Sequence, residues 1–282
     1  MEGLARISPV LPSQHPDSNS AIKNTNFATM SAEKTWSTWQ KRHLEHVKNQ
    51  VAKAISEFGM LNNGDRVLAA VSGGKDSLVM LDALAAFRKF NRVNFHLEAI
   101  HITVEDVPYQ TDIHWLKQHA GRLDVPLHVL NIRAGMEERG KKAPCFVCSW
   151  HRRKTLFTFA KEHNFQKLAL GHHRDDAVET LLINMAYHGH ISSLPGKLSM
   201  FGGRMDLIRP LLLLTDKDTR QYAAIRQFPE QIEECPYSDL TKRNTARKLL
   251  ETLKEIHPKA TANLFRSMQN IDTEYLPQKQ EK

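Results

Sequence analysis

The chain has 282 residues, of which 41% are hydrophobic, and it carries a formal net charge of +8. This length allows one large domain with appendages or two small ones, and the basic excess favours a polyanionic partner such as nucleic acid, with a merely basic protein as the alternative. The composition argues against a membrane protein or a secreted one, because no apolar run approaches the roughly 20 residues that span a bilayer and the N-terminus lacks the apolar core of a signal peptide.

Periodicity divides the chain into five segments. Residues 1–32 are expected to be a disordered tail, because Ser, Asn and Pro recur there without a sustained pattern. Residues 33–61 are expected to form an N-terminal helix with an apolar stripe of Leu44, Val47, Val51, Ile55 and Phe58. A core domain is expected over 62–214, a helical C-terminal region over 215–272 and a polar tail over 273–282.

Strands and helices alternate along the core domain. Strands are expected at residues 67–70, 95–103, 126–132, 167–170 and 206–209. Helices are expected between them, one of them over 109–123. This alternation predicts an α/β fold with a doubly wound parallel sheet of five strands, which binds ligands at the carboxyl ends of its strands. The C-terminal region begins at Thr215–Asp218, which resembles a helix N-terminal capping box. Its helical apolar stripe is expected to end before His257.

The stretch Val71–Ser77, Val-Ser-Gly-Gly-Lys-Asp-Ser, joins the first strand to a helix. Glycines let the backbone turn tightly and approach a ligand, and the helix that follows directs unpaired N–H groups and its positive end at the same point. Such a turn binds anions, most often phosphate. The spacing does not fit the Walker pattern. The alternative is an ordinary glycine turn with a serine-capped helix.

This stretch resembles the PP-loop, Ser-Gly-Gly-x-Asp-Ser, of the N-type ATP pyrophosphatases. The resemblance implies an enzyme that activates a carbonyl or carboxylate oxygen by adenylation and releases pyrophosphate. ATP is therefore the expected nucleotide.

A second motif, Leu-Gly-His-His-Arg-Asp-Asp at residues 170–176, follows the expected strand 167–170 and opens a helix. Its glycine, Gly171, and its acidic pair are expected to face the same crevice as the glycine-rich loop. Carboxylates at such a place suit Mg²⁺, which binds through one or two of them and through substrate phosphates. The alternative is that Asp175 and Asp176 only complement the helix dipole.

The chain has three cysteines, and Cys145 and Cys148 stand in C-x-x-C spacing before a helix whose start is basic. An odd number of cysteines, two of them in this spacing, argues against a disulfide framework. It favours a reducing compartment, so a cytoplasmic location is expected. A helix N-terminus and cationic neighbours favour thiolates. Five interpretations of this pair remain open: a structural zinc site with His151 as fourth ligand, a dithiol, a persulfide carrier, an iron–sulfur cluster, and two buried bystander thiols. Cys235 is the one further thiol that could join a metal site.

Basic residues flank the cysteines in sequence and could follow a phosphate backbone. They are Arg152, Arg153, Lys154, Lys242, Arg243, Arg247 and Lys248. A solvated helix face is the alternative. Three aromatic residues could stack on bases or pack in the core, namely Trp150, Phe157 and Tyr237.

The order of these motifs resembles the tRNA 2-thiocytidine synthetase family (TtcA). Ser-Gly-Gly-Lys-Asp-Ser, Pro-Cys-x-x-Cys with Arg-Arg, Leu-Gly-His-His-Arg-Asp-Asp, Ile-Arg-Pro-Leu and a late cysteine match from about Asn62 to Leu250. In that family the cysteines hold a [4Fe–4S] cluster with one iron open, ATP adenylates a cytidine of the tRNA anticodon loop, and sulfur replaces O2. The resemblance thus implies ATP, Mg²⁺ and the cluster as cofactors.

The motifs and the resemblance together give the candidate site. The catalytic candidates are Asp76, Cys145, Cys148 and Asp175. The nucleotide-binding candidates are Ser72, Gly73, Gly74, Lys75, Asp76, Ser77, His101, Gly171 and Asp175. The candidate iron ligands are Cys145, Cys148 and Cys235, and the candidate Mg²⁺ ligands are Asp175 and Asp176, with Asp76 as a possible bridge. The expected partners are the tRNA anticodon stem-loop, a sulfur donor such as a cysteine desulfurase, and a second copy of the chain.

One departure from the family pattern bears on the substrate. The family often has a second C-x-x-C late in the chain, and here Ile232 occupies its first cysteine position. Three thiolates still suffice for a cluster with an open site. The competing interpretations are a thiolase for another tRNA base or for a substrate other than tRNA, a lysidine-synthetase-like or guanine-amidating PP-loop enzyme, a zinc-stabilised thiolase that uses a cysteine persulfide, and a non-enzymatic nucleotide-binding module.

Three expectations test this interpretation. Cys145, Cys148 and Cys235 should converge in space. Replacement of Asp76 or Ser77 by alanine should abolish turnover with the fold retained, because both are expected to contact little core. Reversal of Arg243 and Arg247 to Glu should weaken tRNA binding and leave ATP binding intact.

Overall fold

The computed structural model describes residues 36–90, 93–107, 111–135, 143–230 and 242–277. These residues belong to one compact unit, Trp36–Lys282. The boundaries expected at 61/62 and 214/215 both fall inside this unit, and the tail expected at residues 1–32 lies outside the described residues.

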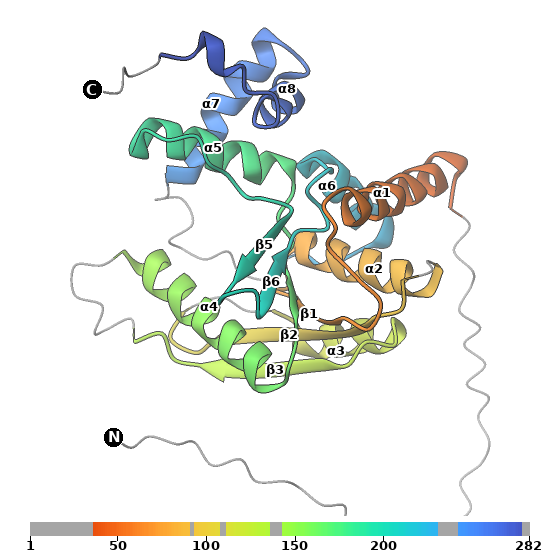
Figure 1. Cartoon of the computed structure of the whole chain (residues 1–282). Coiled ribbons are helices and arrows are strands. Elements are labelled where there is room, and N and C mark those ends of the chain that lie inside the picture. Colours follow the sequence, from red (N-terminus) through yellow and green to blue (C-terminus); the bar gives the residue numbers. More distant parts are fainter. Residues whose placement is uncertain (1–35, 91–92, 108–110, 136–142, 231–241, 278–282) are drawn as a thin grey trace, which may run out of the picture. The chain divides into compact units, whose positions relative to one another are not determined.

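Within the described residues one sheet of six strands forms the centre of the unit, in the order β3-β2-β1-β4-β6-β5 (Figure 1). The strands are β1 Arg66–Ala70, β2 His96–Val104, β3 Leu127–Ile132, β4 Lys167–Ala169, β5 Lys197–Met200 and β6 Met205–Ile208. Five of them are parallel and correspond to the five expected strands, so the doubly wound α/β fold is confirmed.

The sixth strand, β5, runs antiparallel to β6 at the edge of the sheet, and the expectation of an all-parallel five-stranded sheet was wrong in this respect. Its four residues are mostly exposed, so they lack the apolar run that marked the other strands. The turn after β5 was the sequence signal that could have indicated this strand. Phe201, Gly202 and Gly203 all have positive φ, as a tight connection between antiparallel strands requires.

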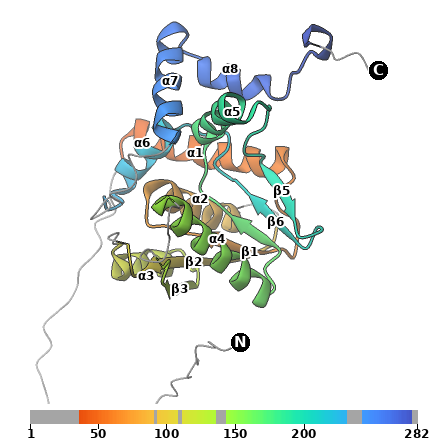
Figure 2. The same cartoon turned by 90° about the vertical axis from the view of Figure 1, so that its left-hand side faces the viewer.

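Two apolar clusters lie on opposite faces of the sheet. The first joins the sheet to α1 Thr38–Glu57, α2 Lys75–Phe90, α3 Ile113–Arg122 and α6 Asp216–Arg226. The second joins Leu68, Ile100 and Leu168 of the strands to Phe159 and Ala160 of α4, which spans Pro144–Glu162. The helix α4 therefore covers the face opposite to α2 (Figures 1 and 2).

Side-chain caps determine where several helices begin. The Ser37 side chain forms a reciprocal capping box with Gln40, and Thr215 forms the expected one with Asp218. The helix expected over 109–123 begins later, at Ile113, because the Asp112 carboxylate accepts a hydrogen bond from the backbone N–H of Trp115. Caps of this kind fix a boundary that periodicity leaves open by several residues.

The C-terminal helices pack beside α5, which spans Arg174–His188 (Figure 2). They are α7 Lys242–Ile256 and α8 Ala260–Ser267, followed by a short 3-10 turn at Thr273–Tyr275. The end of α7 before His257 confirms the expected stop. In the described part of the chain, none of the helices combines the length and the apolar character needed to traverse a bilayer.

Candidate functional site

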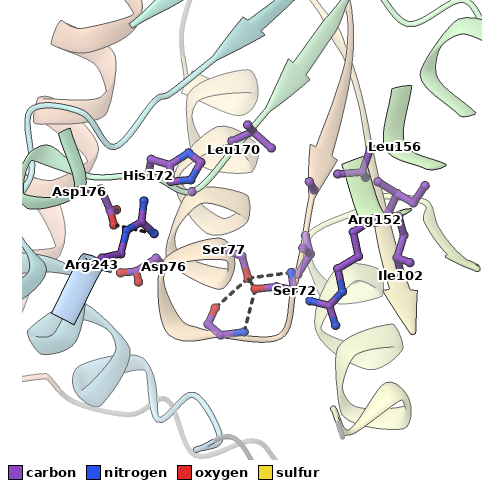
Figure 3. A pocket seen from close by; sticks show the side chains of 15 residues that line it. Ser72, Asp76, Ser77, Ile102, Arg152, Leu156, Leu170, His172, Asp176 and Arg243 are labelled. Atoms are coloured by element: carbon purple, nitrogen blue, oxygen red, sulfur yellow. Dashed lines mark hydrogen bonds and ion pairs between the residues drawn. The ribbon is translucent and has the colours of Figure 1, made fainter. Parts of the chain in front are cut away.

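The candidate site lies where the strand order reverses. The strand β1 pairs with β2 on one side and with β4 on the other, so the segments that leave β1 and β4 run next to each other. A cavity of about 340 Å³ opens between these segments and α4. Its base is formed by the glycine-rich loop, one side by His172, Asp176 and Arg243, and the other by α4 (Figure 3).

Hydrogen bonds within the loop hold it in a fixed shape. The Ser77 hydroxyl donates to the Gly74 carbonyl at 2.8 Å and accepts from the Ser72 backbone N–H at 3.1 Å. The Ser72 hydroxyl accepts from the Gly74 N–H at 3.4 Å. Ser77 is only 6% exposed, so it is not at an open helix start as expected, and its replacement would loosen the loop as well as remove a hydroxyl.

Two glycines are required for the shape of the cavity. Gly73 has φ of +91°, and a Cβ there would lie 2.5 Å from the Thr111 side chain, whose hydroxyl donates to the Ser72 carbonyl at 3.2 Å. A Cβ on Gly171 would lie 3.0 Å from the backbone nitrogen of Ser77 and 3.1 Å from the carbonyl carbon of Asp76. The loops after β1 and β4 are thus in backbone contact, which leaves the N–H groups at the start of α2 open to an anion.

The Lys75 ammonium lies between two carboxylates. Its Nζ is 2.8 Å from Asp76 Oδ1 and 2.8 Å from Asp216 Oδ1. Burial raises the pKa of Asp216, but the hydrogen bond and charge of Lys75, together with Arg220, outweigh it and lower this pKa to about 2. Burial likewise lowers the pKa of Lys75, and the two carboxylates reverse the effect, so Lys75 keeps its positive charge.

A group of three side chains could hold a metal ion. One ligand atom from each of Asp76, His173 and Asp216 lies within 4.8 Å of the other two. Asp76 also accepts a hydrogen bond from the Thr219 hydroxyl at 2.6 Å, which fixes the orientation of its carboxylate. Asp216 and His173 were absent from the candidates chosen from the sequence. Both follow parallel strands at their carboxyl ends, and this position in the fold was the signal that could have found them.

The acidic pair of α5 separates into two roles. Asp176 lines the cavity, where its carboxylate caps α5 at the His173 N–H, 3.0 Å away, and lies 3.7 Å from Arg243. Asp175 does not line the cavity. Its two oxygens accept from the Asp216 N–H at 3.0 Å and from Lys254 at 3.3 Å, so it connects α5 to α6 and α7. Consecutive helix residues point in different directions, and for this reason only one of the pair faces the cavity.

A buried acid that the sequence did not single out anchors the basic face of α7. Glu179 is buried, and its carboxylate lies 3.0 Å from Arg247 and 3.6 Å from Arg243. Burial raises the pKa of Glu179 in spite of these arginines. Reversing Arg243 and Arg247 to Glu would set acids against Glu179 and Asp176 and disturb the cavity wall, so such variants cannot test RNA binding separately from ATP binding.

The thiols lie on the helix that forms the other wall of the cavity. Cys145 and Cys148 occupy the first turn of α4 and are half-buried. Cys148, Arg152 and Leu156 follow one another at four-residue spacing, and the latter two line the cavity. Residues four apart share one face of a helix, so Cys148 lies one turn, about 6 Å along the axis, beyond Arg152. Cys148 does not itself line the cavity and packs against the small apolar cluster of Val104, Val107 and Ala134. Cys235 lies outside the described residues, and its convergence with the other two stays a prediction.

The remaining sequence candidates take other positions. His101 is buried on the opposite side of its strand from Ile100 and Ile102, which line the cavity, and its Nδ1 lies 2.7 Å from the Val71 carbonyl. His101 can therefore stabilise the glycine-rich loop from the side of the sheet that faces away from the cavity. Burial lowers the pKa of His101. Arg153, Lys154 and Trp150 are exposed on α4, whereas the side chain of Lys242, like Tyr237, lies outside the described residues.

Comparisons with known proteins agree on one family. Residues 43–253 match the PP-loop domain family. The chain is 33% identical over 237 residues to a tRNA-cytidine(32) 2-sulfurtransferase of Marinobacter nauticus, with 82% of this chain and 78% of that protein covered. It is 34% identical over 230 residues to the enzyme of the same name from Hahella chejuensis, with 80% of each covered.

A solved structure extends this similarity. The U34-tRNA thiolase NcsA of Methanococcus maripaludis, determined with its [4Fe-4S] cluster, superimposes with a TM-score of 0.70 at 25% identity. The match covers 84% of this chain and 81% of that one.

Proposed function

Because the chain belongs to the PP-loop domain family, and within it to the family of the tRNA-cytidine(32) 2-sulfurtransferases, we propose that it is an ATP-dependent enzyme that replaces O2 of cytidine 32 in tRNA by sulfur. One observation supports this best. The face of α4 that lines the ATP cavity with Arg152 and Leu156 continues directly into Cys148. The thiol thus lies one helical turn beyond the residues that line the cavity, close enough for nucleotide activation and sulfur transfer to meet at one end of α4.

The loop residues provide the adenylation half of the reaction. Backbone N–H groups at the start of α2 and the hydroxyl of Ser72 bind the phosphates of ATP, and the Lys75 ammonium balances their charge. The O2 atom of the base attacks the α-phosphorus, and the bond to pyrophosphate breaks. Placed donors of this kind stabilise negative charge without rearrangement during the reaction.

The carboxylates around Lys75 would hold the Mg²⁺ that accompanies ATP. Asp76 and Asp216 offer the oxygen ligands that Mg²⁺ prefers, and His173 closes the group. Lys75 lies between the two carboxylates and so offsets part of their negative charge when no cation is bound. Arrival of MgATP would move Lys75 from the carboxylates to the phosphates, since both sets of anions compete for one ammonium.

The sulfur half depends on the thiols. Cys145 and Cys148 at the N-terminal turn of α4, near Arg152 and Arg153, are a donor set that fits iron–sulfur ligation, because thiolates are favoured there. Cys235 would be the third ligand. When bound, a [4Fe–4S] cluster would supply the sulfur nucleophile for C2 of the base. The chain itself positions the adenylated base against the thiols and keeps water from the C2 atom; AMP then leaves with the original oxygen.

The RNA partner would be recognised by charge on α4. Arg153 and Lys154 are exposed beside the thiol end of the helix, where they can bind phosphates of the anticodon stem-loop. The base must leave its stack to enter the cavity, which is easiest in a loop. The sulfur donor, the cytoplasmic location and the homodimer expected from the sequence stay predictions.

Analysis of the nucleosides formed by the enzyme tests the proposal. The protein is purified anaerobically and incubated with ATP, Mg²⁺, sulfide and tRNA that contains cytidine 32. Digestion and mass spectrometry should detect 2-thiocytidine, and a tRNA with uridine at position 32 should stay unmodified. A thiolated uridine at position 34, or no thiolated nucleoside at all, would refute the assignment to cytidine 32.

A further inference from the structure

A second recess, of about 520 Å³, lies between the C-terminal half of α4 and the β5–β6 hairpin. Gln166 and Met205, which line it, stand at the amino ends of β4 and β6, whereas Gly171 of the ATP cavity follows the carboxyl end of β4. Among the described residues the two cavities have no lining residue in common. The recess is therefore a separate feature of the molecule.

The interior of the recess is aromatic. Phe165 and Met205 are buried beneath it, and the rings of Phe157 and Phe201 meet edge to face at 5.4 Å between centroids. Phe201 is 50% exposed, so one side of its ring faces solvent. A flat ligand could lie against that side and gain the same kind of contact that Phe157 makes with the ring.

The position of Phe201 is costly for the backbone. It has φ of +54°, in the left-handed region that a bulky residue rarely adopts, although Gly202 and Gly203 directly beside it have no such restriction. The carbonyl of Phe201 accepts a hydrogen bond from Arg204 Nε at 2.9 Å, which helps to hold this conformation. Backbone strain of this kind clusters at ligand-binding sites, and an exposed aromatic surface rimmed by polar residues is typical of an interaction site.

The rim of the recess is basic. Lys154, Lys161 and Arg204 line it and are exposed, and its described lining residues include no Asp or Glu. None of the three cations forms an ion pair with a carboxylate in the described part of the chain. The Lys154 ammonium lies 5.2 Å above the Trp150 ring, which continues the aromatic and basic surface toward the thiol end of α4.

We propose that this recess binds an unpaired nucleotide of the RNA substrate, with its base against Phe201 and its phosphates at Lys154, Lys161 and Arg204. Aromatic faces flanked by Lys and Arg are the common means by which proteins hold single-stranded nucleic acid, because bases stack on the rings and the cations bind the backbone. An acidic protein could also bind the three cations, but it would not place a flat group against the exposed face of the Phe201 ring. The inference rests on the proposed function only for the identity of the RNA as tRNA.

The helix α4 connects this site to the ATP cavity. Arg152 lines the cavity and Lys161 lines the recess, nine residues and about 13 Å apart along the helix axis. A folded RNA is wide enough to touch both. A nucleotide held at the recess would fix the orientation of the RNA, so that one loop base and no other reaches the ATP.

Binding measurements with surface variants test the inference. The variants Phe201→Ala, Arg204→Glu and Lys161→Glu change exposed side chains and are each compared with a matched change elsewhere. Phe90→Ala is the control for the ring, since Phe90 is exposed at the end of α2, and Lys53→Glu on α1 is the control for charge. Circular dichroism confirms that each variant is folded. The affinity for tRNA is measured by fluorescence anisotropy at several salt concentrations.

Phe201→Ala should bind tRNA about tenfold more weakly than Phe90→Ala, because stacking of one base contributes ~1–3 kcal/mol. Arg204→Glu and Lys161→Glu should also bind more weakly than Lys53→Glu, because each places a negative charge beside the phosphates. ATP affinity should not change. Phe201→Trp should keep the affinity, and its added fluorescence should fall when a short single-stranded RNA binds. Affinities within about twofold of the controls for Phe201→Ala and Arg204→Glu would overturn the inference, since a single stacked base already contributes more.

Two further results separate this inference from the proposed function. If the wild-type enzyme leaves cytidine 32 unmodified while Phe201→Ala still loses RNA affinity, the recess stands and the proposed function fails. If the variants bind tRNA normally but lose sulfur transfer from a donor protein, the recess docks that protein and the RNA inference fails.

Discussion

Lys75 and the two carboxylates around it determine how the site responds to a cation. Asp216 Oδ1 is 2.8 Å from the Lys75 ammonium and belongs, with Asp76 and His173, to the group that could hold a metal ion. Because Lys75 shares these carboxylates, a divalent cation must compete with it, and phosphates of ATP that attract Lys75 should make the cation bind more tightly. Coupling of this kind is reciprocal, so the cation should also tighten ATP binding.

Replacement of Asp216 by asparagine should weaken this coupling. Asp216→Asn removes one oxygen anion from the group, and we expect the affinity for Mn²⁺ in the presence of ATP to fall at least about tenfold, on the scale of a lost charged ligand. Asp124→Asn, which changes a fully exposed carboxylate at the end of α3, is the matched control. Electron paramagnetic resonance titration of Mn²⁺ measures both. Equal affinities for the two variants would exclude Asp216 as a ligand.

An ion pair at the other end of the sheet should determine part of the acid stability. Burial raises the pKa of Asp206, but the hydrogen bonds from Lys167 at 2.7 Å and from Ser199 outweigh it, so this pKa lies below its ordinary value of 3.8. The folded state then binds fewer protons than the unfolded state as the pH falls below that value. The stabilisation is present above the unfolded pKa and is lost as the pH decreases through the folded one.

We therefore expect Asp206→Asn to be less stable than wild type at neutral pH and to lose less further stability below pH ~4. Urea unfolding at a series of pH values measures this, with Asp124→Asn again as the exposed control. A variant whose stability decreases as steeply as that of the wild type in acid would show that the Lys167 pair does not cause the effect.

The site could be predicted from the sequence only where residues follow one another in the chain. Ser72, Asp76 and Ser77 were found because the glycine-rich loop brings them together by itself. Asp216 and His173 join that loop through the sheet order, which no local pattern encodes. Asp175 was a reasonable candidate beside Asp176, yet the direction in which each side chain leaves α5 depends on the packing of α6 and α7.

Among the elements, the two loops at the carboxyl ends of β1 and β4 behave as one unit. Gly171 allows the loop after β4 to touch the backbone of Ser77, and Gly73 gives the other loop its positive φ. Their contact sets the width of the phosphate position. Replacement of either glycine should therefore lower the affinity for the nucleotide more than it lowers the stability of the core.

Gly73→Ala and Gly171→Ala should both lower ATP affinity. Alanine at the Gly73 position costs about 1–2 kcal/mol in backbone strain, in addition to the overlap with Thr111, and alanine at Gly171 must displace the start of α2. Gly121→Ala in α3 has open space around it and should stabilise the helix by about 0.5–1 kcal/mol. Calorimetric ATP titration measures the effect. If the ATP affinity of both loop variants were unchanged, ATP would not bind at this loop.

If the three cysteines hold the proposed cluster, removal of any one thiol should lower the iron content of the protein. We expect Cys145→Ser, Cys148→Ser and Cys235→Ser, purified anaerobically, to contain less iron per chain and to lose visible absorption, because all three would ligate one cluster. His151→Asn distinguishes iron from zinc. It should keep its iron if the cluster has an open site, whereas loss of zinc from this variant would favour a zinc site. Full iron in Cys235→Ser would contradict the convergence of the three cysteines.

Most elements were predictable because their apolar periodicity is local, as in α1 and β2. The edge strand β5 was not, since its residues face solvent and its pairing with β6 is decided by the turn at Gly202–Gly203. The start of α3 was misplaced for a different reason, because it is determined by a single side-chain cap, the Asp112 carboxylate at the Trp115 N–H.

At the scale of the molecule, α4 connects all the chemistry. Its first turn holds two thiols, its middle lines the ATP cavity and its last turns line the aromatic recess. Under the proposed function, a substrate that lies along this helix would meet the thiols, the ATP held by the glycine-rich loop and the recess in a fixed order. Under that function, rigid placement of this kind would favour one loop base over the others.

The central claim is that ATP bound at the glycine-rich loop activates the oxygen that sulfur replaces, and an isotope label tests it most directly. Transfer RNA with ¹⁸O at O2 of cytidine 32 is incubated with the enzyme, ATP, Mg²⁺ and sulfide, and the AMP is examined by mass spectrometry. If the base oxygen attacks the α-phosphorus and later leaves with it, one ¹⁸O atom should appear in AMP for each 2-thiocytidine formed. Unlabelled AMP alongside 2-thiocytidine would contradict the account.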